Sequence, residues 1–166
     1  DIQLIRDSGT SVATIPNSNM KLGSATLKIP DFLKAGINLA IGTDGPASNN
    51  NQSMIREFQQ LARTQKVVHR DPTVVEAKQL LRMASMNGAR AYGMEKDLGS
   101  LETGKKADLI IINPGQPHWY PHYDPYNSMV YAMHSEDVES VMIDGKLIMD
   151  HRQLEFIDQE KILAGM

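Results

Sequence analysis

Short apolar runs alternate with stretches of helical spacing over residues 1–96 of the chain. The runs at residues 11–14 and 37–41 predict strands, and the second is apolar except for Asn38, without polar–apolar alternation, as in a strand buried on both faces. Between them, residues 29–35 have the spacing of a short helix that Gly36 would close. Strands separated by a helix predict a parallel sheet covered by helices, so we expect strand 37–41 to lie parallel beside strand 11–14.

Three further helices are expected in this part of the chain. Apolar side chains recur at helical spacing over residues 54–66, and the three asparagines at 49–51 most simply cap that helix. Thr73 is the expected cap of a second helix, over residues 74–83, and a third covers residues 85–92. The pattern therefore predicts a β/α arrangement up to residue 96.

The pattern changes in the rest of the chain. Apolar runs that predict strands lie at residues 107–112, 138–143 and 146–149. An Asp-Gly pair at 144–145 separates the last two runs and predicts a β-hairpin. Residues 114–125 form a proline-rich loop, and residues 156–163 are expected to close the chain as a helix. The chain thus divides into a β/α part, residues 1–96, and a mainly β part, residues 97–166.

Composition excludes several classes of function. The net charge of -3 and the absence of clustered Lys and Arg argue against nucleic acid as a partner. There is no cysteine, so disulfides and thiolate metal sites are excluded. The longest apolar stretches, such as residues 109–112, are far below the roughly 20 residues of a membrane span, and we expect a cytoplasmic protein without a membrane partner.

Asp44 is the candidate for chemistry. It stands in a Gly-Thr-Asp-Gly run directly after the predicted strand 37–41, and the carboxyl ends of strands carry the active site in β/α barrels. An aspartate there can bind a divalent metal and accept a proton from a water whose pKa the metal lowers to about 7. From the spacing alone, a turn aspartate between glycines is the simpler interpretation, and both stay open at this point. The asparagines at 49–51 could also shape the floor of such a site.

The histidines are weaker candidates. His118 and His122 have the spacing of a metal-binding pair on a helix, but the three prolines around them forbid that helix and favour a surface or interface loop. His69, His134 and His151 are isolated along the sequence. The sequence contains no His-x-His pair and no Gly-x-Ser-x-Gly run.

Several runs of residues, taken in order, resemble one known family. They are PNSNMKLGS at 16–24, GTDGPASNN at 42–50, GSLETGKKADL at 99–109, PHWYP at 117–121 and VMIDGK at 141–146. Together they resemble the amidohydrolase superfamily, within it the branch of the 5'-methylthioadenosine/S-adenosylhomocysteine deaminases and the triazine chlorohydrolases. One position departs from the pattern, because Ile15-Pro16 stands where the family usually has His-Cys-Pro or His-Asn-Pro.

The resemblance implies an α/β fold: the C-terminal part of a (β/α)8 metal-dependent hydrolase barrel, with part of a small β-sandwich. It also implies one divalent metal, usually zinc. In the family the ligands are a His-x-His pair, a further His, and the aspartate that matches Asp44. The implied reaction is attack of hydroxide on C6 of an adenine-type ring with loss of ammonia, in which Asp44 accepts and passes on the water's proton.

We therefore expect a zinc-dependent deaminase of an adenosine-type nucleoside thioether, 5'-methylthioadenosine or S-adenosylhomocysteine. The alternatives are another ring C–N or C–Cl amidohydrolase, of triazine, guanine or cytosine type, and a non-catalytic binding domain that keeps the fold. The other ligands and the catalytic Glu and His are expected in a missing N-terminal half of the same protein, because a barrel needs six more strands. A nucleoside-like small molecule and further copies of the chain are the expected partners.

Overall fold

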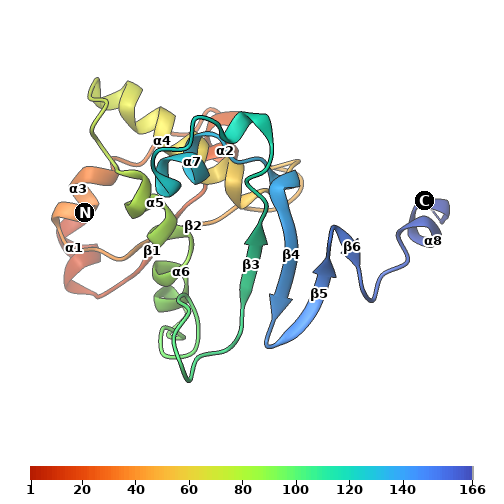
Figure 1. The fold of residues 1–166 in the computed structure, drawn as a ribbon. Helices are drawn as coiled ribbons and strands as arrows, with labels where there is room; N and C mark the ends of the chain where they lie inside the picture. The colour runs from red at the N-terminus through yellow and green to blue at the C-terminus, as the bar shows by residue number, and fades with distance from the viewer. Residues whose placement is uncertain (166) are drawn as a thin grey trace.

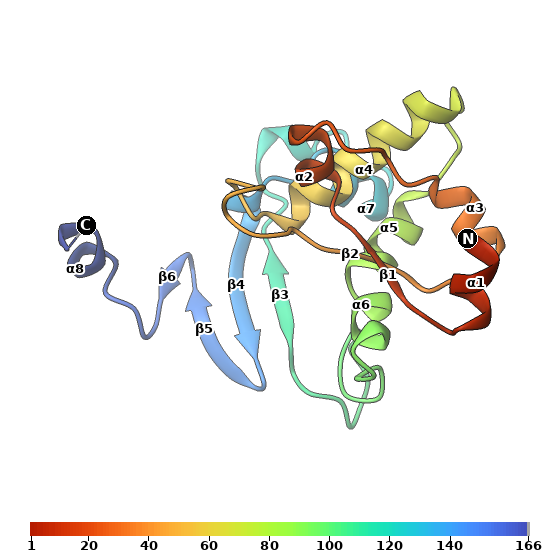
Figure 2. The ribbon, with the colours of Figure 1, turned by 180° about the vertical axis from the view of Figure 1, so that it is seen from behind.

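The computed structural model describes residues 1–165 (Figures 1 and 2). The helices are α1 Ile2–Asp7, α2 Pro16–Lys21, α3 Ile29–Lys34, α4 Met54–His69, α5 Ala77–Ala84, α6 Met86–Ala91, α7 Pro125–Tyr131 and α8 Gln159–Ala164, with 3-10 turns η1 Pro117–Trp119 and η2 Ser135–Asp137. The strands are β1 Val12–Thr14, β2 Leu39–Ile41, β3 Leu109–Ile112, β4 Val138–Ile143, β5 Lys146–Asp150 and β6 Gln153–Leu154. Helices α1 to α7 gather at one end, and the sheet of β3 to β6 extends from them toward α8 (Figure 1).

The two short N-terminal strands form a parallel pair, as the sequence predicts. Leu39 lies opposite Val12 and Ile41 opposite Thr14. All three residues of β2 are buried, which explains its uninterrupted apolar character. Two helices lie between the strands, the unpredicted α2 and the predicted α3. The glycine after α3, Gly36, has a φ of +76°, which ends that helix.

Helix α4 packs its apolar side into the core and is the longest helix of residues 1–165. Its cap differs from the prediction: Ser53, not the asparagine run, accepts a hydrogen bond from the backbone N–H of Arg56 at 3.5 Å. Asn49 is buried and bonds elsewhere, because its side chain donates to Thr43 O and to Glu57. Two polar residues, Glu57 and Gln65, are buried on this otherwise apolar side.

The predicted cap of the next helix is wrong. Helix α5 begins at Ala77, and a capping box closes its start, in which the backbone N–H of Glu76 donates to Gln79 Oε1 at 3.0 Å. Thr73 instead donates its hydroxyl to the Asp71 carboxylate at 2.6 Å. The Thr73 hydroxyl therefore bonds within a local turn to Asp71 and does not cap the helix.

The second part of the chain contains a four-stranded antiparallel sheet in the order β3-β4-β5-β6. The Asp-Gly pair forms the predicted β4–β5 hairpin, with φ values of +50° at Asp144 and +75° at Gly145. Helix α7 was not predicted, because it begins inside the proline-rich segment. Proline is tolerated at the first helical position, and Pro125 stands there with the Asp124 carboxylate as cap.

The hydrophobic core combines both parts of the chain. Val130 and Met133, at and just after the end of α7, are buried with Leu61 of α4 and Leu80 of α5. Helix α7 contacts α4 and α5 directly. Within residues 1–165, no helix is both long and apolar enough to cross a bilayer.

Candidate active site

Asp44 lies where the chain leaves β2. Because β1 and β2 are parallel, the segments that follow them emerge at the same edge of the sheet. The segment after β1 becomes α2, which carries Ser18, and the segment after β2 carries Asp44 and Ser48. Asp44 is exposed and has a φ of +65°, a left-handed conformation that aspartate tolerates better than most residues.

Two hydroxyl groups orient the Asp44 carboxylate. Its Oδ2 atom accepts hydrogen bonds from Ser48 Oγ at 2.6 Å and from Ser18 Oγ at 2.7 Å. The pKa of the Asp44 carboxyl is held below its usual value by these hydrogen bonds. The bond from Ser48 has the largest effect, followed by that from Ser18 and by a bond from the backbone of Gly45. The group is therefore ionised at neutral pH, and an exposed, ionised, oriented carboxylate suits a divalent metal. In this form it is also able to accept a proton.

A buried network lies behind Asp44. Glu57 of α4 accepts hydrogen bonds from the backbone and side chain of Asn17 and from the side chain of Asn49. Lys21 of α2 crosses to the loop after β2 and donates to Ala47 O at 2.8 Å. The loops that follow the two strands are thus joined to each other and to α4.

Glu57 was not among the site residues predicted from the sequence. The signal was present, because a charged residue stands at a position of the α4 helical pattern that is otherwise apolar. Its partners lie 40 and 8 residues away, and spacing alone does not identify them.

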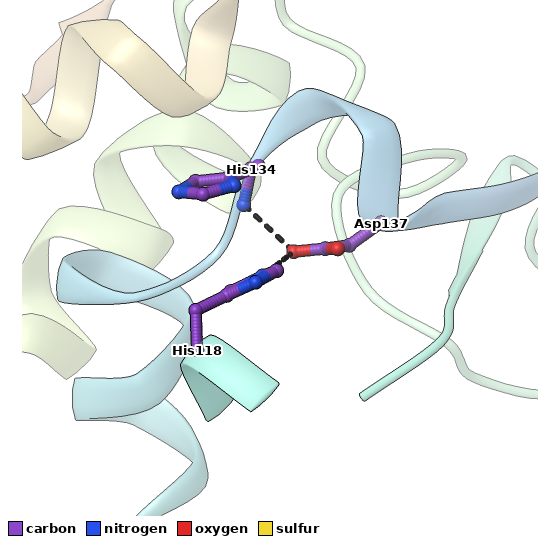
Figure 3. A group of neighbouring side chains, drawn as sticks. All are labelled: His118, His134 and Asp137. Carbon is purple, nitrogen blue, oxygen red and sulfur yellow. Dashed lines mark hydrogen bonds and ion pairs between the residues drawn. The ribbon is translucent and has the colours of Figure 1, made fainter. Parts of the chain in front are cut away.

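A second cluster joins His118, His134 and Asp137 (Figure 3), whose ligand atoms lie within 4.8 Å of one another. The Asp137 Oδ2 atom accepts hydrogen bonds from His118 Nε2 at 2.8 Å, the backbone N–H of His134 at 2.8 Å and Trp119 Nε1 at 3.0 Å. His134 is therefore not isolated. His118 is partly buried in a 3-10 turn instead of lying free in a surface loop.

The geometry of this cluster is that of a hydrogen-bonded hub. The His118 and His134 rings stack with centroids 4.1 Å apart and planes 20° from parallel. A ring nitrogen binds a metal through a lone pair in the ring plane at about 2 Å, so two stacked rings direct their lone pairs past one another. The one Asp137 oxygen already has three donors. The hub fastens η1 to η2 just before β4.

The hub gives a pH-dependent prediction for stability. Burial raises the pKa of the Asp137 carboxyl, but the bonds from His134, His118 and Trp119 together hold it below its usual value. The carboxylate therefore stabilises the fold fully above about pH 4, and this contribution is lost as the pH falls through the folded-state pKa. We expect Asp137→Asn to lower the free energy of unfolding at neutral pH by roughly 2 kcal/mol.

Denaturant unfolding across the acid range measures this effect. The difference between Asp137→Asn and wild type should shrink at acid pH, whereas the exposed Asp97→Asn should change little at any pH. A loss of equal size in acid and at neutral pH would show that the charge of Asp137 is not its source.

Of the residues suggested by the sequence, Asp44 lies at the shared edge of β1 and β2, and Asn49 of the asparagine run joins the buried network next to it. Within residues 1–165, the one group of three or more potential ligands is the hub of His118, His134 and Asp137, so no such group includes Asp44.

Known proteins resemble the chain over nearly its whole length. Residues 1–148 match the amidohydrolase family. The chain is 47% identical, over 98% of its length, to a 5-methylthioadenosine/S-adenosylhomocysteine deaminase of Acetivibrio thermocellus, and 44% identical, over 99%, to that of Moorella thermoacetica. It spans 38% of the length of each of these relatives.

Two solved structures resemble the fold closely. An adenosine deaminase from Xanthomonas campestris with bound zinc superposes with a TM-score of 0.95 at 36% identity, over 99% of this chain and 37% of that one. An atrazine chlorohydrolase from Arthrobacter aurescens complexed with zinc gives a TM-score of 0.90 at 26% identity, over 99% of this chain and 36% of that one.

Proposed function

The chain belongs to the amidohydrolase family, and we therefore propose that it is part of a zinc-dependent hydrolase that deaminates 5'-methylthioadenosine or S-adenosylhomocysteine. The observation that carries the proposal is the oriented, ionised Asp44 carboxylate at the shared edge of two parallel strands. The relatives named as deaminases of these two compounds match nearly the whole chain at 44–47% identity, which supports the substrate class.

The proposal includes an architecture for the complete protein. Strands β1 and β2 would be the last two strands of a (β/α)8 barrel, within residues 1–96. The sheet of β3 to β6, within residues 97–166, would belong to a β-sandwich. Support comes from the parallel pairing of β1 with β2 and the antiparallel order of the second sheet.

The residues of this chain fit one part of a metal site. Asp44 would be one ligand, and histidines from the remainder of the protein would complete the set, because a single carboxylate cannot hold zinc against water. Bound zinc lowers the pKa of a water molecule to about 7, so hydroxide is available at neutral pH.

The proposed chemistry uses Asp44 as a proton carrier. Its carboxylate accepts the proton that the attacking water loses and returns it to the departing amine. The ring carbon thereby exchanges its C–N bond for a C–O bond, and ammonia leaves. Ser18 and Ser48 keep the carboxylate in one orientation during both transfers, because both hydroxyls donate to the same oxygen.

Two other functions are alternatives to this proposal, and the activity assay described next distinguishes them. A triazine, guanine or cytosine-type ring is the neighbouring alternative, supported by the resemblance to the chlorohydrolase. A binding domain without activity is the other, since Ile15 stands where the family has a polar residue.

We expect the complete protein, loaded with zinc, to release ammonia fastest from the two thioether nucleosides. Ammonia release from these, adenosine, guanine and cytosine, and chloride release from a chlorotriazine, measure the preference. A faster reaction with guanine, cytosine or the triazine would replace the proposed substrate. A protein that retains no zinc and acts on none of them would be a binding domain.

A further inference from the structure

Helix α4 carries a buried glutamate on its apolar side. Glu57 is 0% exposed and shares the buried side of the helix with Ile55, Phe58 and Leu61. A carboxylate in such a place is costly unless hydrogen bonds compensate for the lost water. Among residues 1–165, no lysine, arginine or histidine forms an ion pair with it. Hydrogen bonds to neutral donors must therefore offset the cost.

The donors come from the two loops that leave the parallel strands. Asn17, after β1, donates its backbone N–H to Glu57 Oε2 at 3.0 Å and its side-chain Nδ2 to Oε1 at 2.8 Å. Asn49, after β2, donates its side-chain Nδ2 to the same Oε1 atom. The Asn49 amide also donates to Thr43 O at 2.7 Å, one residue before Asp44.

The two asparagines are sequence neighbours of the two serines that hold Asp44. Asn17 precedes Ser18, and Asn49 follows Ser48. Each serine donates to Asp44 Oδ2, and each adjacent asparagine donates to Glu57. Asp44 and Glu57 therefore lie at two ends of one network, with the same two loops between them.

We propose that Glu57 is a positioning residue of the active site, which acts through Asn17 and Asn49 to hold Ser18 and Ser48 against Asp44. The role rests on the proposed function, because it assigns Glu57 to the orientation of the carboxylate that carries the chemistry. Glu57 itself touches no reacting atom.

A carboxylate suits this place better than an amide. Both Glu57 oxygens receive only N–H donors. In Glu57→Gln, one oxygen becomes an NH2 group, which would face a donor from Asn17 or Asn49. The isosteric change therefore displaces at least one loop, although it removes no volume.

Gln65 provides a matched control on the same helix. It is also 0% exposed and also joins a loop to α4, because it accepts from the Ile29 N–H at 3.1 Å and donates to Leu27 O at 2.8 Å. Its partners lie at the start of α3, before β2, instead of in the loops that follow β1 and β2. Gln65→Met removes both bonds without touching the network of Asp44.

The experiment compares Glu57→Gln with Gln65→Met in the complete protein. We expect Glu57→Gln to lower kcat by roughly 10- to 100-fold with little change in KM, and to weaken zinc retention in chelator competition. Gln65→Met should lower Tm while leaving kcat and zinc retention unchanged. A crystal structure of Glu57→Gln should show that Ser18 or Ser48 no longer bonds to Asp44.

The readouts separate this proposal from the proposed function. If the wild type deaminates no nucleoside, the function fails, while the crystal structure of the variant still tests Glu57. Equal effects of the two variants on kcat and zinc at equal loss of Tm would overturn the positioning role, as would an unchanged Asp44 environment. If Glu57→Gln does not fold, Asn17→Ala removes only the 2.8 Å bond. It should lower kcat in the same direction at a loss of Tm no greater than that of Gln65→Met, because two of the three donors to Glu57 remain. An unchanged kcat there would overturn the proposal.

Discussion

Replacing Asp44 in the complete protein is expected to lower kcat for deamination by about a thousandfold or more and to release zinc, while unfolding stays cooperative. The change removes a metal ligand and a proton carrier together, so both steps of the proposed reaction are lost. The side chain is exposed, so its contribution to the core is small. Alanine is unfavourable at a φ of +65°, whereas asparagine tolerates it, so Asp44→Asn separates the charge from the backbone effect.

Zinc content, kcat and thermal unfolding, measured on the same preparations, test this result. Asp71→Ala is the matched control, because Asp71 is also exposed. A hydrogen bond from the Thr73 hydroxyl lowers the pKa of Asp71, as the serine hydroxyls do for Asp44. Asp71 lies in the segment between α4 and α5, not in the segments that directly follow β1 and β2. Near-normal turnover by Asp44→Ala with its zinc in place would show that the assigned role is wrong.

Residues 1–166 expressed alone are expected to deaminate nothing and to bind zinc weakly, which is the second large effect. One carboxylate of the expected ligand set is present, and it cannot hold the metal by itself. Strands β1 and β2 also form a sheet of only two strands, so each has an unpaired edge. Ile110, Ile111 and Ile143 of the second sheet are half exposed. A two-stranded sheet is marginal in water, so further protein should cover these surfaces.

Mixing the chain with the remainder of the protein measures how far its activity depends on that remainder. The part of the relatives' length that this chain does not match would be supplied as a second polypeptide, and ammonia release would be followed with and without it. Activity only after mixing is the expected result, and sedimentation of the mixture tests the expected homo-oligomer. Full activity of residues 1–166 alone, or a stable monomer with a closed core, would contradict it.

Features set by short-range patterns were predictable from the sequence. The parallel β1–β2 pair followed from two apolar runs with a helix between them, and the β4–β5 hairpin from Asp-Gly between apolar runs. The location of Asp44 just after β2 followed from the same pattern. Its role as a ligand came from the family resemblance and stays a prediction.

Features that depend on distant partners were not predictable in this way. The hub around Asp137 joins residues 19 apart across a proline-rich segment, and its prolines also concealed helix α7. The failure at Thr73 is local: its residue type suits a cap, but its hydroxyl donates to Asp71, two residues earlier. Glu57 stands on the apolar side of α4, but its three donors come from the loops after β1 and β2, which spacing alone does not bring to it.

The left-handed backbone at Asp44 also restricts which metal ligands this position could adopt by mutation. Glutamate could bind the same ion, but residues of its kind meet a steric penalty of about 1–2 kcal/mol at such a φ. Histidine tolerates this backbone better but lacks the negative charge. Asparagine fits the backbone but lacks the negative charge, and glycine has no ligand at all. Aspartate is the residue that meets both demands. A designer who wishes to change the metal preference of this site would therefore have to rebuild the turn after β2 before exchanging the ligand.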